Sequence, residues 1–187
     1  DWDSETTELA WDVSSDSNGL WTYNYTWSVA EGAKDISHII FQVSDNFTTE
    51  NIYNGTTDGY ELGTYSGDDN SNPGMPGEIK GLKFDTDLQF GTDLTFNIIT
   101  DRAPMWGNFY GKDGVFDGNN VYAYNSGFGT GIDLTQYAIG DGNLINKTDF
   151  GFLLVPDTTT TVIPEPSTWI LMVAGLSGLG FIVRRKN

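Results

Sequence analysis

The clearest pattern in the chain is a strict alternation of apolar and polar residues over positions 20–29. LWTYNYTWSV places Trp21, Tyr23, Tyr25 and Trp27 on one side of an extended strand and small polar residues on the other. A period of two predicts a half-buried β-strand. Similar but shorter apolar runs predict further strands at 36–43, 78–84, 93–100, 120–124 and 150–155.

Turn-forming stretches rich in Gly, Asn and Asp separate these runs, and residues 1–155 show no sustained 3.6-residue apolar period. Short strands joined by turns predict an all-β fold, and specifically a single antiparallel β-sandwich of jelly-roll-like type in residues 1–155. Residues 156–163 are rich in Thr and bounded by prolines. We interpret them as an extended linker.

We call residues 1–155 the body and residues 164–187 the tail. The tail differs from the body in its pattern of apolar residues. No charge occurs from Trp169 to Val183, and a helix over this run would be about 22 Å long, or about 27 Å if counted from Pro166, against a hydrocarbon core of about 30 Å. The tail therefore predicts a single transmembrane helix, with Arg184, Arg185 and Lys186 on the cytoplasmic side and the body outside. The alternative is a C-terminal helix buried in the body, which the preceding linker and the absence of a polar face disfavour.

The order of these features resembles a known signal. Pro164-Glu165-Pro166, a short apolar span and a basic cluster, together residues 164–187, resemble the PEP-CTERM sorting signal of exported bacterial proteins. The resemblance implies export, transient tethering in the inner membrane, processing by an exosortase-type enzyme, and delivery to the cell surface or extracellular matrix. A chain that opens at Asp1 without Met agrees with an expected removal of a signal peptide.

The body also resembles a type of domain that recurs in such proteins. The likeness lies in ISHIIF, GEIKGLKFD and DRAPMWGNFYGKDG. It implies no assigned reaction and therefore no catalytic residue.

Charge narrows the range of partners. Residues 1–163 hold six Lys and Arg against 25 Asp and Glu, a formal charge of −19. Such a surface repels nucleic acid and anionic lipid and favours cations. The chain has no cysteine, which excludes disulfides and thiol chemistry.

The acidic loops contain weak candidates for a calcium site. Asp85 and Asp87 in one run, and Asp113 and Asp117 in another, offer the oxygen ligands that Ca²⁺ prefers. The first run is not an EF-hand loop, because its sixth and twelfth positions are phenylalanines. The same carboxylates could form the acid pair of a glycosidase, but the spacing singles out no pair.

Aromatic residues raise the possibility of a carbohydrate surface. Trp106, Phe109 and Tyr110 are candidates for sugar contact, and their alternative role is to fill the core. The only histidine, His38, is expected on a face shared with Ile36 and Ile40, which favours a packed side chain over a general base.

We therefore expect an exported structural or adhesive protein of the cell surface or extracellular matrix, with polysaccharide or copies of itself as partners and no enzymatic activity. The alternative is a carbohydrate-binding module, and a glycoside hydrolase comes third. A binding module should expose a row of aromatic rings, a hydrolase should have a cleft with converging carboxylates, and a structural subunit should offer an apolar patch or a free strand edge.

The acidic loops generate a test of cation binding. If Ca²⁺ binds only the folded body, millimolar calcium should raise the melting midpoint, because a ligand of the native state adds to the free energy of unfolding. Thermal melts at fixed ionic strength, with magnesium and with chelator as controls, measure the effect. An unchanged midpoint would mean that the acidic residues bind no structural calcium.

Overall fold

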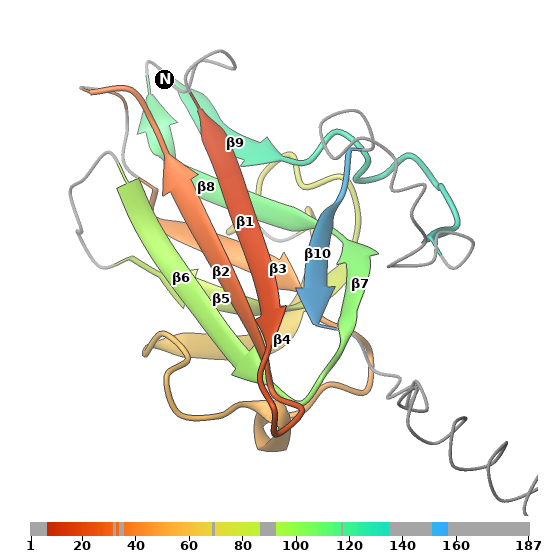
Figure 1. Ribbon diagram of the computed structural model, residues 1–187. Helices are drawn as coiled ribbons and strands as arrows, with labels where there is room; N and C mark the ends of the chain where they lie inside the picture. The colour runs from red at the N-terminus through yellow and green to blue at the C-terminus, as the bar shows by residue number, and fades with distance from the viewer. Residues whose placement is uncertain are drawn as a thin grey trace, which may run out of the picture.

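The computed structural model describes residues 7–31, 33, 36–68, 70–86, 93–116, 118–134 and 151–156. Within them the chain forms ten β-strands and one short 3₁₀ helix (Figure 1). The strands are β1 (Glu8–Ser15), β2 (Trp21–Ser28), β3 (His38–Gln42), β4 (Tyr60–Tyr65), β5 (Ile79–Asp85), β6 (Asp93–Thr100), β7 (Pro104–Gly107), β8 (Phe109–Phe116), β9 (Asn119–Tyr124) and β10 (Leu153–Pro156); the helix is η1 (Thr49–Asn51). The prediction of an all-β fold is confirmed.

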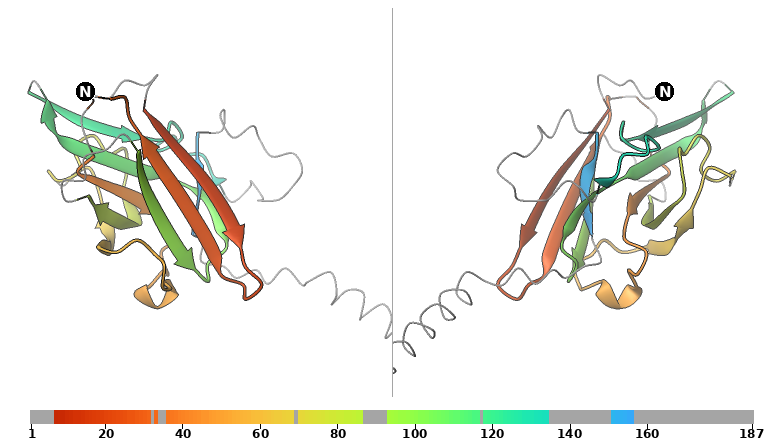
Figure 2. Two further views of the ribbon diagram at one scale, coloured as in Figure 1. Left: turned by 60° about the vertical axis from the view of Figure 1, so that its left-hand side comes forward. Right: turned by 90° about the vertical axis from the view of Figure 1, so that its right-hand side faces the viewer.

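The described strands pair into three antiparallel sheets. The first has the order β1-β2-β6, the second β4-β5-β3-β8-β9, and the third pairs β10 with β7. Figure 2 shows the first sheet as one layer lying over the five-stranded sheet, and in Figure 1 their strands cross.

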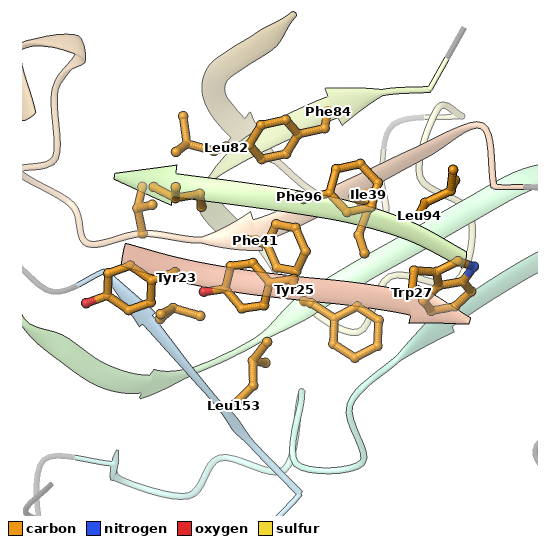
Figure 3. Packing of buried hydrophobic residues seen from close by; sticks show 14 of the residues in the cluster. Tyr23, Tyr25, Trp27, Ile39, Phe41, Leu82, Phe84, Leu94, Phe96 and Leu153 are labelled. Atoms are coloured by element: carbon orange, nitrogen blue, oxygen red, sulfur yellow. The ribbon is translucent and has the colours of Figure 1, made fainter. Parts of the chain in front are cut away.

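One core fills the space between these layers. Tyr23, Tyr25 and Trp27 of β2 lie in one cluster with residues of β3, β5 and β6, as Figure 3 shows. Tyr25 and Phe41 stack with ring centroids 3.9 Å apart, and Phe96 of β6 contacts both Phe41 and Phe84. Burial of large rings replaces the missing disulfides as the main source of stability in this body.

The chain passes from one sheet to another at Asn108, the single residue between β7 and β8. Its backbone N–H and side-chain amide both donate to Oε1 of Gln42, at 2.9 and 2.8 Å. The side-chain amide of Asn125 donates to Oδ1 of Asn108, and Oδ1 of Asn125 accepts from the N–H of Phe109. These amides satisfy backbone groups that the change of sheet would otherwise leave unpaired.

The outer edge of β6 is covered by the segment 52–57. Tyr53 and Thr57 donate their N–H groups to Ile99 and Asn97, and the hydroxyls of Thr56 and Thr57 accept from the N–H groups of Ile99 and Asn97. Such a cover removes part of an edge that could pair with another chain. The two end strands of the five-stranded sheet are β4 and β9.

The outer face of the five-stranded sheet carries a second, smaller cluster. It consists of Ile40, Met75, Ile79, Tyr110 and Phe128, with Tyr65 packed against it. We call residues 70–78 the covering loop, because its Met75 belongs to this cluster and three of its residues bond to the sheet. Nζ of Lys112 donates to the carbonyl of Ser71, and the hydroxyl of Tyr110 to that of Pro73. Nε2 of His38 donates to Oδ1 of Asn72 at 3.1 Å.

The strands predicted at 20–29, 36–43, 78–84, 93–100, 120–124 and 150–155 correspond to β2, β3, β5, β6, β9 and β10, whereas β1, β4, β7 and β8 were not predicted. Two interpretations need correction. Lys112 to Phe116 belongs to β8, with a register shift between Lys112 and Val115, and is not a loop. Ile36 precedes β3 and joins the main core, so it does not share a face with His38 and Ile40.

The ring contacts of Phe41 generate a stability prediction. Phe41 is fully buried and touches Tyr25, Phe84 and Phe96, so Phe41→Ala should lower the free energy of unfolding by about 3–5 kcal/mol through lost burial and a cavity. Urea denaturation measures the loss. Tyr53→Ala, at a 40% exposed tyrosine, is the control and should change stability by about 0.5 kcal/mol or less. Equal losses in both variants would contradict the central role of Phe41.

The environment of His38 generates a pH prediction. Burial lowers the pKa of His38 below its usual 6.5, and the bond to Asn72 opposes this effect. Because the unfolded imidazole takes up a proton at a higher pH than the folded one, stability present above about pH 6.5 should be lost as the pH falls through the folded pKa.

NMR titration of the single imidazole measures this pKa directly, and His38→Gln should remove the corresponding step from the pH dependence of unfolding. An apparent pKa at or above 6.5 in the folded protein would contradict the prediction.

Candidate functional site

The three aromatic residues expected to contact sugar are buried. Trp106 makes an edge contact with Trp11 at 6.1 Å, and Phe109 makes one with Trp27 at 6.2 Å. Tyr110, which follows Phe109 on β8, is completely buried on the outer face of the five-stranded sheet. Their burial contradicts the prediction that these rings offer a face to carbohydrate. All three serve the packing of the body instead, which was the alternative considered for them.

Next to Tyr110, two other tyrosines reach the surface. Tyr122 and Tyr124 of β9 are 40% and 41% exposed. The rings of Tyr110 and Tyr122 are 6.2 Å apart and 19° from parallel, and those of Tyr122 and Tyr124 are 6.2 Å apart and 10° from parallel. We call Tyr110, Tyr122 and Tyr124 the tyrosine row. It begins beneath the covering loop and continues onto the exposed part of the outer face.

Strand geometry explains this arrangement. Residues 120, 122 and 124 lie on one face of β9, while Val121 and Ala123 face the main core. Tyr124 pairs in register with Tyr110 across the β8–β9 ladder, and Tyr122 pairs with Lys112. The near-parallel rings therefore come from successive positions on one face of two neighbouring strands.

Contacts on both sides fix the row. In the middle of the row, Gly74 of the covering loop lies so close to Tyr122 that a Cβ there would clash with the ring, and its φ is +73°. Only glycine suits this position. At the Tyr124 end, Phe128 makes an edge contact with Tyr124 at 6.2 Å. The exposed rings are therefore held by neighbours and do not extend freely from the surface.

Chemically, the tyrosine row is a neutral surface of ring faces and hydroxyls. Burial, with a smaller contribution from Tyr122, raises the pKa of Tyr110 well above its usual value, so its hydroxyl stays protonated and continues to donate to Pro73. The row offers no nucleophile or acid–base pair. Ring faces and hydroxyls can contact a ligand through packing and hydrogen bonds.

Sequence reasoning predicted the strand at 120–124 but not the role of its tyrosines. Alternation alone places Tyr122 and Tyr124 on one face and Val121 on the other. Both faces contain apolar side chains, so the pattern does not identify the face that packs on the main core. The neighbouring run of small and polar residues, 125–127, gives no further signal.

The acidic candidates do not form a recognisable metal site. Asp85 lies at the end of β5, exposed and paired with Nζ of Lys83 at 2.9 Å. Asp113 lies at the register shift in β8, while Asp87 and Asp117 lie outside the described residues. Among the described residues, no group of three or more His, Asp or Glu side chains could hold a metal ion. Calcium binding stays a prediction.

A shallow open depression lies elsewhere on the described surface, with a volume of about 350 Å³. Polar residues dominate its lining, and Nζ of Lys80 donates to the backbone carbonyl of Asp45 within it. The lining residues are Gln42, Asp45, Thr64, Glu78, Ile79 and Lys80. Asp45 and Glu78 bring two exposed carboxylates to the depression, but no aromatic ring on which a sugar could stack lines it.

The predicted tail lies outside the described residues. Pro164, Glu165 and Pro166, the predicted transmembrane helix, and Arg184, Arg185 and Lys186 all belong to it. Within the described part of the chain, no helix has the length and apolar character needed to cross a membrane.

Comparison with known proteins bears on this tail. Comparison with curated proteins and with solved structures found no match for the chain. Residues 162–186 match the family model of the PEP-CTERM protein-sorting motif. The matched range includes Pro164-Glu165-Pro166 and the basic residues that follow the apolar run. The chain therefore carries a PEP-CTERM protein-sorting motif, as an exosortase substrate does.

Proposed function

We propose that this protein is a structural or adhesive component of the bacterial cell surface or extracellular matrix. The observation that carries the proposal is the sorting motif at residues 162–186, which implies processing by exosortase. The motif follows an acidic body with an all-β fold. The role of the body is non-enzymatic in this proposal.

In this proposal the tail acts before the body does. The apolar run and the basic cluster stop transfer in the inner membrane, and the linker holds Pro164-Glu165-Pro166 outside it. Each proline disfavours helix at the residue before it, which keeps the tripeptide extended and accessible to a membrane enzyme. Cleavage then releases the body to the surface or matrix.

We interpret the body as a jelly-roll-like β-sandwich suited to such a setting. The ring contacts between β2, β3, β5 and β6 support the interpretation, because they join two sheets across one core. A packed, cysteine-free sandwich folds after export without oxidative help. It also leaves the outer face at β9 available for contacts, because Tyr122 and Tyr124 are partly exposed there.

Carbohydrate binding is the second candidate function, favoured by the exposed rings of Tyr122 and Tyr124. The two candidates are compatible, since an adhesive protein of a polysaccharide matrix needs a surface that holds sugar. A glycoside hydrolase ranks below both, because it needs two carboxylates placed on either side of a bound sugar, and the exposed tyrosine row has no such pair among its members.

Processing of the tail is the direct test. We expect the mature extracellular protein to end near residue 164 and to lack residues 169–187, as C-terminal peptide mass spectrometry of secreted material would show. Replacing Pro164, Glu165 and Pro166 together by Ala should leave the body folded but retained in the membrane fraction.

The matched control replaces Thr158, Thr159 and Thr160 by Ala, which changes the linker but not the motif, and should leave release intact. Recovery of the terminal Arg-Arg-Lys-Asn sequence from protein outside the cell would refute the proposed processing. Release of the triple motif variant at the normal level would refute it as well.

A further inference from the structure

We propose that the tyrosine row binds an uncharged polysaccharide chain, whose sugar rings pack on Tyr122 and Tyr124. The inference deepens the proposed function and rests on it in one respect, namely that export brings the body to extracellular polysaccharide. The binding itself is a property of the surface and can be tested on the purified chain.

The orientation of the rings is the first argument. Tyr122 and Tyr124 are within 10° of parallel, with centroids 6.2 Å apart, and two-fifths of each residue is exposed. The faces of a pyranose ring carry C–H groups that pack well on aromatic rings, whereas its edge carries hydroxyls. Two similarly oriented tyrosines at a fixed spacing suit a ligand that repeats the same flat unit along its length.

Rigidity is the second argument. Gly74 contacts the tip of Tyr122, Tyr110 lies beside it, and Phe128 contacts Tyr124. The covering loop is in turn bonded to the sheet through Asn72, Pro73 and Ser71. Because the rings are ordered before the ligand arrives, binding loses little side-chain entropy.

Charge selects the type of polysaccharide. The sequence of β9 is NNVYAY, which contains no charged residue, and the exposed Asn120 shares the outer face with the tyrosines. Amide and hydroxyl groups can bond sugar hydroxyls there. The charged neighbour that pairs with Tyr122 is Lys112, whose ammonium donates to the carbonyl of Ser71 in the covering loop. Residues 1–163 carry a formal charge of −19, so this part of the chain repels anionic polymers over long range. An uncharged chain meets the ring faces without this repulsion.

A second copy of the protein is the other occupant to consider. Pairing at the edge of β9, an end strand of the described sheet, would use its backbone groups and leave the ring faces unused. Two copies of the chain, each with a formal charge of −19 over residues 1–163, also repel each other. Both observations favour polysaccharide over self-association at this surface.

The test is affinity electrophoresis of the full chain in a polyoxyethylene detergent, which has no sugar headgroup to compete. The gels contain dextran, galactomannan, mixed-linkage β-glucan or hydroxyethylcellulose, with anionic alginate as a comparison. We expect retardation by at least one uncharged polymer. Tyr122→Ala and Tyr124→Ala should each weaken binding by about twofold to twelvefold, since one aromatic contact contributes about 0.5–1.5 kcal/mol.

Two further variants make the result specific. Tyr124→Phe keeps the ring and should bind within about threefold of the parent chain, because the ring face provides the contact. Tyr53→Ala removes an equally exposed tyrosine from the segment that covers β6 and should bind normally. Circular dichroism checks that each variant is folded. If Tyr122→Ala does not fold, Tyr124→Ala alone provides the test.

The proposal is overturned if no uncharged polymer retards the parent chain, if alginate alone does, or if Tyr53→Ala weakens binding as much as Tyr124→Ala. It is also overturned if light scattering finds a dimer that Tyr124→Ala dissociates while no polymer binds, which would make the surface an interface between copies. None of these outcomes depends on tail processing, so failed export and failed binding remain distinguishable.

Discussion

The contacts of Tyr25 hold all three sheets together. Its ring, on β2, stacks on Phe41 of the five-stranded sheet with centroids 3.9 Å apart, and its hydroxyl donates to the carbonyl of Leu154 in β10 at 2.8 Å. Burial raises the pKa of Tyr25 well above its usual value, so the hydroxyl stays a donor throughout the physiological range. In a chain without cysteine, this one side chain joins all three described sheets.

The position of the tyrosine row follows from how the five-stranded sheet is covered. Its inner face is filled by the main core, so apolar residues on its outer face need a second cover. The covering loop supplies it over Ile40 and Tyr110 through Met75 and its bonds to the sheet. At the end strand β9, Tyr122 and Tyr124 remain partly exposed. An aromatic surface thus lies where the second cluster meets solvent.

Sequence reasoning succeeded where one face of a strand is apolar and the other polar, as in β2, because alternation then identifies the strand and its buried side. It did less well where the local structure depends on contacts with residues distant in the sequence. β7 and β8 look like one run, and the change of sheet at Asn108 depends on distant Gln42 and Asn125. The surroundings of Tyr110 and Tyr122 could not be predicted for the same reason. Their contacts with Pro73 and Gly74 form only when the covering loop packs on the sheet.

Sorting and binding make different demands on the chain, and this separates their residues. A sorting motif must be extended and reachable, so its information lies in short local sequence that a family model recognises at residues 162–186. A binding surface needs rings fixed by neighbours from several strands, so its residues are scattered over 74–128. The motif therefore identifies the route of the protein without constraining its body. What the body does at its destination must follow from its own surface, and there the uncharged tyrosines of an otherwise acidic domain are the most distinctive chemistry.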